Sequence, residues 1–181
     1  MESGKKVFVT IGTTKFPKLI NSLTQKVVVK TLIELGYDFV QVQTGKYFPG
    51  PKIDSELDKT VINDSTIVIN SRITFKYDTY FIDFDSQIAK ADLIISHAGA
   101  GTCLEVLKRR KPLIVVVNED LMNNHQTELA NQLQNDGYLY YCTCETLAQT
   151  LKKDLNKLIH YPETDKYLFA KYLDKCVGFI E

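Results

Sequence analysis

The sequence has no excess of charge of either sign, because its 22 Lys and Arg residues balance 22 Asp and Glu residues over 181 positions. A chain without a net field is not expected to hold nucleic acid or an anionic membrane across its whole surface, so any anion site has to be local. No apolar run approaches the roughly 20 residues of a membrane-spanning helix, and the longest is PLIVVV. The first residues, MESGKKVFVTIG, lack the apolar core of a secretory signal. We therefore expect a soluble, cytosolic protein.

Cysteine is also sparse. The four residues Cys103, Cys142, Cys144 and Cys176, in a chain without a secretory signal, indicate reduced thiols. Cys142 and Cys144 form a C-x-C pair, but no second pair or suitably spaced histidine completes a zinc site. We expect these thiols to serve in packing, and we expect no metal site.

The familiar nucleotide-binding motifs are missing. A dinucleotide fold needs G-x-G-x-x-G after its first strand, whereas the first turn here reads GTTKFP and the second strand ends VQVQTG without an acid. A P-loop needs G-x-x-x-x-G-K-[ST], and TGKY supplies only Gly-Lys. No G-x-S-x-G elbow occurs. These absences count against dehydrogenases, P-loop NTPases and α/β-hydrolases.

Runs of Val, Ile and Leu alternate with amphipathic segments, which is typical of a parallel sheet covered by helices on both faces. The expected fold class is α/β: an open, mostly parallel sheet with helices on both faces, in a single domain of residues 1–181. Residues 46–80 are expected to be a variable excursion, exposed over 46–66 and β-rich over 66–78. Further strands are predicted at 6–11, 37–45, 92–96, 112–118 and 138–143. Helices are predicted at 17–35, 86–91, 102–110, 125–135, 145–159 and 163–177.

The stretch SHAGAGTCLEVL, residues 96–107, places a small, hydrogen-bonding corner between a predicted strand and a helix. Gly99 and Gly101 let a ligand approach the backbone, and helix N-terminal amides favour a phosphate or diphosphate. Thr102 can donate a hydroxyl to the same anion and His97 a ring N–H, while Glu105 can accept the hydroxyls of a ribose. A structural alternative is a capping box, with Thr102 as N-cap and Glu105 at N3, beside a purely structural His97.

Two other loops follow predicted strands. Gly12 to Thr14 form a hydroxyl-bearing turn suited to phosphate oxygens, or an ordinary turn. Asn118 to Gln126 precede and open a helix, where Asn123 or Asn124 can be the cap and Gln126 can bind sugar hydroxyls, or the sequence is only polar capping. Ligands of open sheets bind beyond the carboxyl ends of the strands, so the three loops are predicted to share one cleft.

These residues also carry a resemblance. ISHAGAGTCLEVLKRRKPLIVVVNEDLMNNHQTELANQL, with VFVTIGTT before it and GYLYYCTC after it, resembles the cytosolic catalytic subunits of the eukaryotic UDP-N-acetylglucosamine transferase that acts on GlcNAc-diphosphodolichol. The carboxyl-terminal half of bacterial MurG is similar more distantly. The resemblance covers most of residues 5–145 and is weakest over about 46–80.

The resemblance implies a GT-B-type, Rossmann-like sugar-nucleotide domain standing alone. It assigns the diphosphate to residues of the first turn and the Gly-rich turn: Thr13, Thr14, Gly99, Ala100, Gly101 and Thr102. It assigns the ribose to Glu105 and the donor sugar to Asn124, His125 and Gln126. MurG-like enzymes often have an acid before that glutamine, where this chain has His125. His97 is the candidate catalytic residue, assisting departure of UDP.

The implied activity is inverting, metal-independent transfer of GlcNAc from UDP-GlcNAc to the 4-hydroxyl of lipid-linked GlcNAc. This adds the second, β-1,4-linked sugar of the N-glycan precursor. No cofactor beyond the donor is implied. The acceptor site and the base are expected on a membrane-anchored acceptor-binding subunit, which would recruit the chain from the cytoplasm to the cytosolic face of the endoplasmic reticulum. The predicted helix at 163–177 is the candidate docking element.

Two alternatives stay open from the sequence. One is a non-catalytic UDP-sugar-binding or regulatory subunit, which would need the same nucleotide pocket. The other is a UDP-GlcNAc epimerase-like enzyme, for which 181 residues leave little room for a partner domain.

Overall fold

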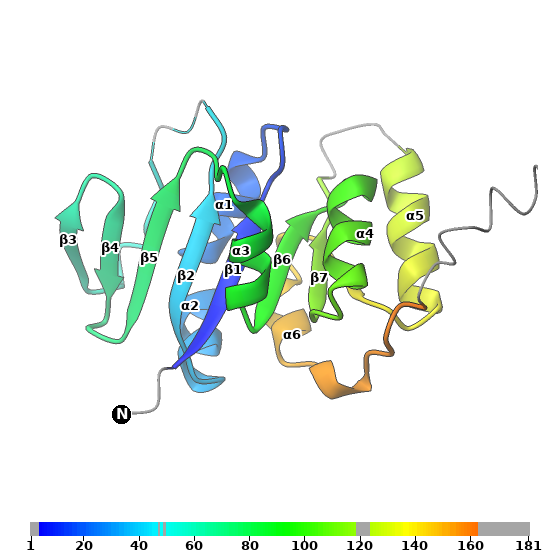
Figure 1. Cartoon of the computed structure of the whole chain (residues 1–181). Helices are drawn as coiled ribbons and strands as arrows, with labels where there is room; N and C mark the ends of the chain where they lie inside the picture. The colour runs from blue at the N-terminus through cyan, green and yellow to red at the C-terminus, as the bar shows by residue number, and fades with distance from the viewer. Residues whose placement is uncertain (1–3, 47, 49, 119–123, 163–181) are drawn as a thin grey trace, which may run out of the picture.

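The computed structural model describes residues 4–46, 48, 50–118 and 124–162. They form an eight-stranded sheet in the order β3-β4-β5-β2-β1-β6-β7-β8 (Figure 1). Neighbours from β5 to β8 pair in parallel, whereas β3–β4 and β4–β5 pair antiparallel. The strands are β1 Lys5–Thr10, β2 Tyr37–Gln43, β3 Lys59–Asn63, β4 Thr66–Ile69, β5 Ile73–Asp78, β6 Leu93–His97, β7 Leu113–Val116 and β8 Tyr140–Cys142. The predicted fold class is confirmed.

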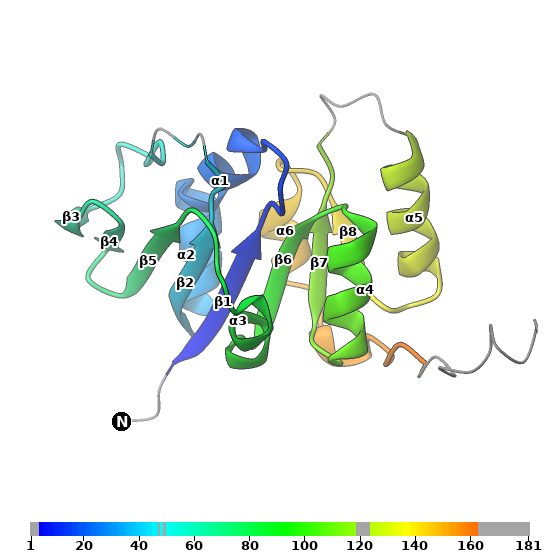
Figure 2. The same cartoon turned by 45° about the horizontal axis from the view of Figure 1, so that its top comes forward.

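Helices cover both faces of the sheet, as Figures 1 and 2 show together. The first face carries α1 Pro17–Leu23, α2 Lys26–Glu34 and α6 Leu147–Leu151, and the second carries α3 Phe84–Lys90, α4 Ala100–Lys108 and α5 Asn124–Asn135. A 3₁₀ turn, Leu155–Lys157, follows α6. The order β-α-β-α with parallel strands results from continuous apolar runs that must be buried from both sides.

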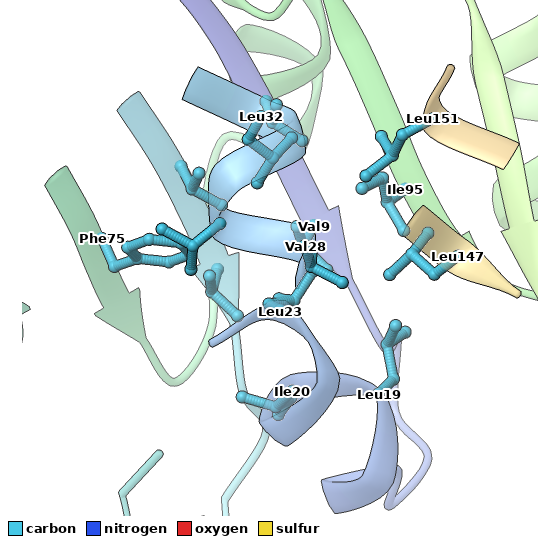
Figure 3. Close-up of a cluster of buried hydrophobic side chains, with 14 of the residues drawn as sticks. Val9, Leu19, Ile20, Leu23, Val28, Leu32, Phe75, Ile95, Leu147 and Leu151 are labelled. Carbon is cyan, nitrogen blue, oxygen red and sulfur yellow. The ribbon is translucent and has the colours of Figure 1, made fainter. Parts of the chain in front are cut away.

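Two hydrophobic cores result, one on each face. In the first, side chains of α1, α2 and α6 such as Leu23, Val28 and Leu147 pack against Val9 and Ile95 of the sheet (Figure 3). In the second, Phe8, whose side chain alternates with those of its strand neighbours, lies among residues of α3, α4 and α5. Each large aliphatic side chain buried in this way contributes about 1.5–3 kcal/mol to the free energy of unfolding. The strands that carry the candidate site are therefore held rigidly from both sides.

The predicted helix at 17–35 is wrong in one respect, because it is two helices that meet at Thr24 and Gln25. The Thr24 hydroxyl lies 2.9 Å from the carbonyl oxygen of Lys52, and the Asp54 carboxylate accepts the amide of Lys26 at 3.2 Å. A distant loop thus bonds the backbone at the break and starts the second helix.

The predicted helix at 145–159 is also wrong. Only α6 and the short 3₁₀ turn form there, since Asp154 accepts the amide of Asn156 at 3.0 Å and begins the new turn. The predicted helix at 163–177 lies outside the described residues.

The β structure predicted over 66–78 is confirmed by β4 and β5, whereas β3 forms within the stretch expected to be an excursion. Of these three strands, β5 pairs in parallel with β2, and Leu57 is buried in the first core. The expected exposure holds for β3, all of whose residues are exposed.

Candidate functional site

The loops after β1 and β6 meet at the side chain of His97, because these two strands are neighbours in the sheet. A Cβ atom on Gly12 would lie 2.6 Å from Cε1 of the His97 ring, and a Cβ atom on Gly99 would lie 2.4 Å from its Nε2. Any side chain at either position would displace the ring. The two glycines are therefore required for the imidazole to lie between the two loops.

The His97 side chain is almost completely buried, with 8% of the residue exposed. Its Nδ1 has no hydrogen-bond partner among the described residues. Burial lowers the pKa of His97 below 6.5. The nearby Thr10 backbone opposes this by raising the pKa, although it makes no hydrogen bond of ordinary geometry with Nδ1. A neutral ring can offer one N–H to an anion, and a nearby negative charge would raise its pKa. A buried imidazole that lies between two loops and whose Nδ1 lacks a partner among the described residues is a candidate for a ligand contact.

The helix that follows β6 begins earlier than predicted, at Ala100, with Gly99 as its N-cap and no side-chain cap. Thr102 is therefore inside the first turn, and Glu105 lies beyond it. The capping-box alternative is thus wrong. The amides of Ala100, Gly101 and Thr102 have no partner among the described residues, as expected for an uncapped helix start. These three N–H groups and the Thr102 hydroxyl form a corner whose chemistry suits an anion.

Gly101 has no structural need to be glycine. Its φ is not in the left-handed region, and a Cβ atom there would meet nothing within 4 Å. Alanine would favour the helix by about 0.5–1 kcal/mol. Its glycine is best explained by close approach of a ligand to the helix start.

In the turn after β1, Gly12 and Thr14 have hydrogen-bond partners, whereas Thr13 has none among the described residues. Both the amide and the hydroxyl of Thr14 bond to the carbonyl of Ile11, at 3.2 and 2.7 Å, and the amide of Gly12 bonds to the hydroxyl of Thr10 at 3.1 Å. The exposed Thr13 keeps both its amide and its hydroxyl without a partner in the described part of the chain. Of the two threonines predicted here, Thr13 is the available donor, and Thr14 mainly closes the turn.

Glu105 lies four residues after Gly101, on the same side of α4. Its carboxylate lies 3.7 Å from the Arg109 guanidinium, which is itself 2.5 Å from Asp85 of α3. Burial, together with a hydrogen bond to Asp85, raises the pKa of Glu105, and Arg109 opposes the rise. The carboxylate is half-buried and oriented, as binding of a pair of hydroxyls requires.

The third predicted loop follows β7, which is the next strand along from β6, so it leaves from the same edge. The structure confirms the helix that follows, which begins at Asn124. The side chains of Asn124, His125 and Gln126 lie outside what the structure describes, and their role in binding the donor sugar stays a prediction.

Two residues of this edge were missed from the sequence. Thr10 and Gln43 end β1 and β2, are buried, and bond to each other at 3.1 Å. The available signal was a polar residue closing a mainly apolar strand, as in VFVT and FVQVQ. Neither residue was distinguished there from ordinary strand ends.

Cys103, Cys142 and Cys144 are buried in the two cores and form no disulfide, which agrees with the predicted packing role, and Cys176 lies outside the described residues. Within the described ranges, no group of three or more His, Cys, Asp or Glu side chains is placed to hold a metal ion. Among the same residues, no helix has both the length and the apolar character needed to cross a membrane.

Comparison with known proteins adds to this geometry. Residues 6–173 match the glycosyltransferase family 28 C-terminal domain. The chain is 43% identical over 145 residues to the human UDP-N-acetylglucosamine transferase subunit ALG13, covering 79% of this chain and 11% of the human protein. It is 30% identical over 194 residues to the Saccharomyces cerevisiae protein of the same name, covering 96% of each. The chain thus spans about a tenth of the human relative and nearly all of the yeast one.

Solved structures show the same relationship. The NMR solution structure of ALG13 superposes with a TM-score of 0.67 at 27% identity, covering 93% of this chain and 94% of that chain. The crystal structure of Acinetobacter baumannii MurG superposes with a TM-score of 0.60 at 18% identity, covering 87% of this chain and 44% of that one. The likeness to MurG shows a shared GT-B-type fold.

Proposed function

The chain belongs to the family of glycosyltransferase family 28 C-terminal domains, together with the ALG13 subunits of UDP-N-acetylglucosamine transferase, and from that premise we propose that it is the donor-binding half of such a transferase. The observation that carries the proposal is the set of unpartnered donors at the ends of β1 and β6. Thr13 supplies one group of donors, the start of α4 supplies the other, and His97 lies between the two loops.

The diphosphate of UDP-GlcNAc is assigned to these donors. The amides of Ala100, Gly101 and Thr102 and the amide and hydroxyl of Thr13 can surround phosphate oxygens, and the helix dipole adds a partial positive charge. During transfer, negative charge develops on the departing UDP. Donors already held in place by the fold stabilise that charge without reorganising.

His97 is the proposed catalytic residue of this half. Its ring lies in the space that Gly12 and Gly99 leave between the two loops, so it does not have to change rotamer to contact the diphosphate. A neutral imidazole can donate its ring N–H to the departing diphosphate and so stabilise part of the developing charge.

Glu105 is proposed to accept the hydroxyls of the ribose. Asn124, His125 and Gln126 are proposed to reach the donor sugar, by analogy with the order of loops in the family. The reaction proposed is inverting and metal-independent transfer to the 4-hydroxyl of GlcNAc-diphosphodolichol.

The second half of the active site is proposed to come from a membrane-anchored acceptor-binding subunit. The name of the relatives describes a transferase subunit, which supports a complex. The proposed site of action is the cytosolic face of the endoplasmic reticulum, reached through that partner from the cytoplasm.

A test of the ribose assignment is Glu105→Gln, with Glu34→Gln on the opposite face as the control. We expect Glu105→Gln to weaken UDP-GlcNAc binding by about tenfold, since charge-assisted hydrogen bonds are worth about 1.5–3 kcal/mol. Binding of the 2′-deoxy donor should change much less. Isothermal titration with both donors measures the two affinities.

The same variants are then assayed for sugar transfer with a membrane extract that contains the partner, with and without excess chelator. Transfer that survives chelation and is lost in Glu105→Gln supports the proposal. Equal affinity of Glu105→Gln and the parent chain for UDP-GlcNAc would remove Glu105 from the site, and transfer that needs added magnesium or manganese would contradict the metal-independent reaction.

A further inference from the structure

Gln43 is a buried polar side chain at the carboxyl end of β2, with 6% of the residue exposed. Its Oε1 accepts the Thr10 hydroxyl at 3.1 Å, and its Nε2 donates to the carbonyl of Gly12 at 3.3 Å. The Thr10 hydroxyl in turn accepts the amide of Gly12 at 3.1 Å. The amide orientation of Gln43 is fixed by this circuit, because the opposite orientation would place two carbonyl oxygens against each other.

The circuit engages both backbone polar groups of Gly12. That residue has φ of +59°, a left-handed conformation that directs the turn beside His97. A peptide carbonyl carries partial negative charge and would repel a phosphate. The bond from Gln43 holds the Gly12 carbonyl to the end of β2.

The consequence falls on Thr13, the next residue. With Gly12 tied to Thr10 and Gln43, and Thr14 tied to Ile11, the amide and hydroxyl of Thr13 are the donors that the turn leaves for a ligand. None of the contacts of Gln43 is with the proposed ligand position itself. It acts on the turn through Gly12.

We propose that Gln43 and Thr10 are positioning residues for diphosphate recognition: they lock the Gly12 peptide so that Thr13 presents its donors to the phosphates. This inference rests on the proposed function, since it explains why the turn after β1 leaves the Thr13 donors available in the proposed diphosphate site. It extends the site to two residues that contact the turn and not the nucleotide.

The chain offers a matched control in Gln41. It lies two residues earlier, on the same face of the same strand, is 9% exposed, and donates Nε2 to the carbonyl of Lys76 at 3.1 Å and to the carboxylate of Asp78 at 2.7 Å. Those partners belong to β5, on the side away from β1. Gln41→Leu therefore removes a similar buried amide without touching the Gly12 turn.

The experiment compares Gln43→Leu, Gln41→Leu, Thr10→Val and Thr10→Ser with the parent chain. Affinities for UDP and for UMP are measured by titration, and stability is measured by thermal unfolding. We expect Gln43→Leu and Thr10→Val to lose about tenfold in UDP affinity, because misplaced Thr13 donors lose charge-assisted bonds to the diphosphate. UMP affinity should change little, so the UDP-to-UMP ratio collapses. Thr10→Ser keeps the hydroxyl and should keep the ratio, as should Gln41→Leu despite its loss of stability.

Thr10→Val keeps the shape and β-propensity of threonine, so it tests the inference even if Gln43→Leu does not fold. A Thr10→Val or Gln43→Leu chain that keeps the parent's UDP-to-UMP ratio overturns the positioning role. A ratio lost equally in Gln41→Leu overturns it as well, because the effect would then be general. If the parent chain binds UDP no better than UMP, the proposed diphosphate site itself is wrong. This outcome differs from the two above, which overturn only the positioning role of Gln43 and Thr10.

Discussion

At the amino ends of β1 and β6 the backbone groups are bonded to neighbouring segments, whereas beyond the carboxyl ends of the same two strands several have no partner in the described chain. At the amino ends, the amide of Lys6 donates to the Asp92 carboxylate at 2.7 Å, and the amide of Asp92 returns a bond to the carbonyl of Lys6 at 2.8 Å. Lys111 bonds the carbonyls of Ala89 and Ala91 at 2.8 Å each.

The carboxyl ends are equally rich in polar groups but leave the donors of Thr13, Ala100, Gly101 and Thr102 unused. The first amides of any helix lack an intrahelical partner, so it is the addition of Thr13 and His97 at the same place that favours an anion here. One end of these strands is closed by hydrogen bonds, and we propose that the other is kept open for an anion. The predictions below change one end at a time.

The largest effect is expected from the two glycines of the open end. Gly99→Ala places a methyl against the His97 ring, so it should cost about 1–3 kcal/mol of stability and abolish nucleotide binding. Gly101→Ala meets open space and should gain up to about 1 kcal/mol from helix propensity, while weakening UDP binding through the added methyl. Chemical denaturation and UDP titration measure both quantities.

The pair separates a structural glycine from a functional one. A Gly101→Ala chain that is more stable and binds UDP as tightly as the parent would show that no ligand approaches the start of α4 closely.

A smaller effect is expected at the closed end. Asp92→Ala removes the acceptor for the Lys6 amide and should lower the free energy of unfolding by about 1 kcal/mol. UDP affinity should not change, because the contact lies at the opposite end of β1 and β6. If Asp92→Ala lowers UDP affinity by more than its loss of stability accounts for, then the amino ends of the strands also affect binding, which would contradict the separation of the two ends.

The smallest effect is the pH dependence contributed by His97. Because burial lowers its pKa in the folded chain, the unfolded chain binds the proton first as the pH falls through about 6.5. His97 therefore has no effect on stability well above pH 6.5 and lowers the free energy of unfolding as the pH falls below it. A bound diphosphate raises the pKa, so UDP-GlcNAc affinity should rise as the pH falls over the same range.

His97→Gln should remove both dependences, while His160→Gln, at an exposed position, should leave them in place. Titration of UDP-GlcNAc at several pH values, with unfolding curves at the same values, checks the two signs. An affinity that falls with falling pH in the parent chain would contradict a role for His97 beside the diphosphate.

Much of this molecule follows from local sequence pattern. The apolar runs that became β1, β2, β6 and β7 were recognisable because a parallel strand buried on both faces must be apolar throughout. The Gly-rich corner was recognisable because glycines before a helix suit an anion. The loops of Gly12 and Gly99 meet at His97, whereas a cleft shared with the third loop stays a prediction, because residues 119–123 lie outside the described part of the chain.

The errors arose where distant residues decide the local structure. The break at Thr24 depends on the backbone of Lys52, 28 residues away, and the Thr10–Gln43 pair joins strands 33 residues apart. The capping box at Thr102 had the right residues but the wrong helix start, since the helix begins at Ala100. These contacts join residues far apart in the sequence, so the residue pattern of a single segment cannot predict them.

The most direct measurement is an amide-resolved NMR titration of the chain with UDP-GlcNAc. The central claim is that the unpaired donors beyond β1 and β6 bind the diphosphate. It predicts that the amides of Thr13, Ala100, Gly101 and Thr102 show the largest shifts, and that those of Lys6, Asp92 and Ile94 at the other end do not move. Saturable binding with these four amides unmoved, or with the largest shifts at the amino ends of the strands, would contradict it.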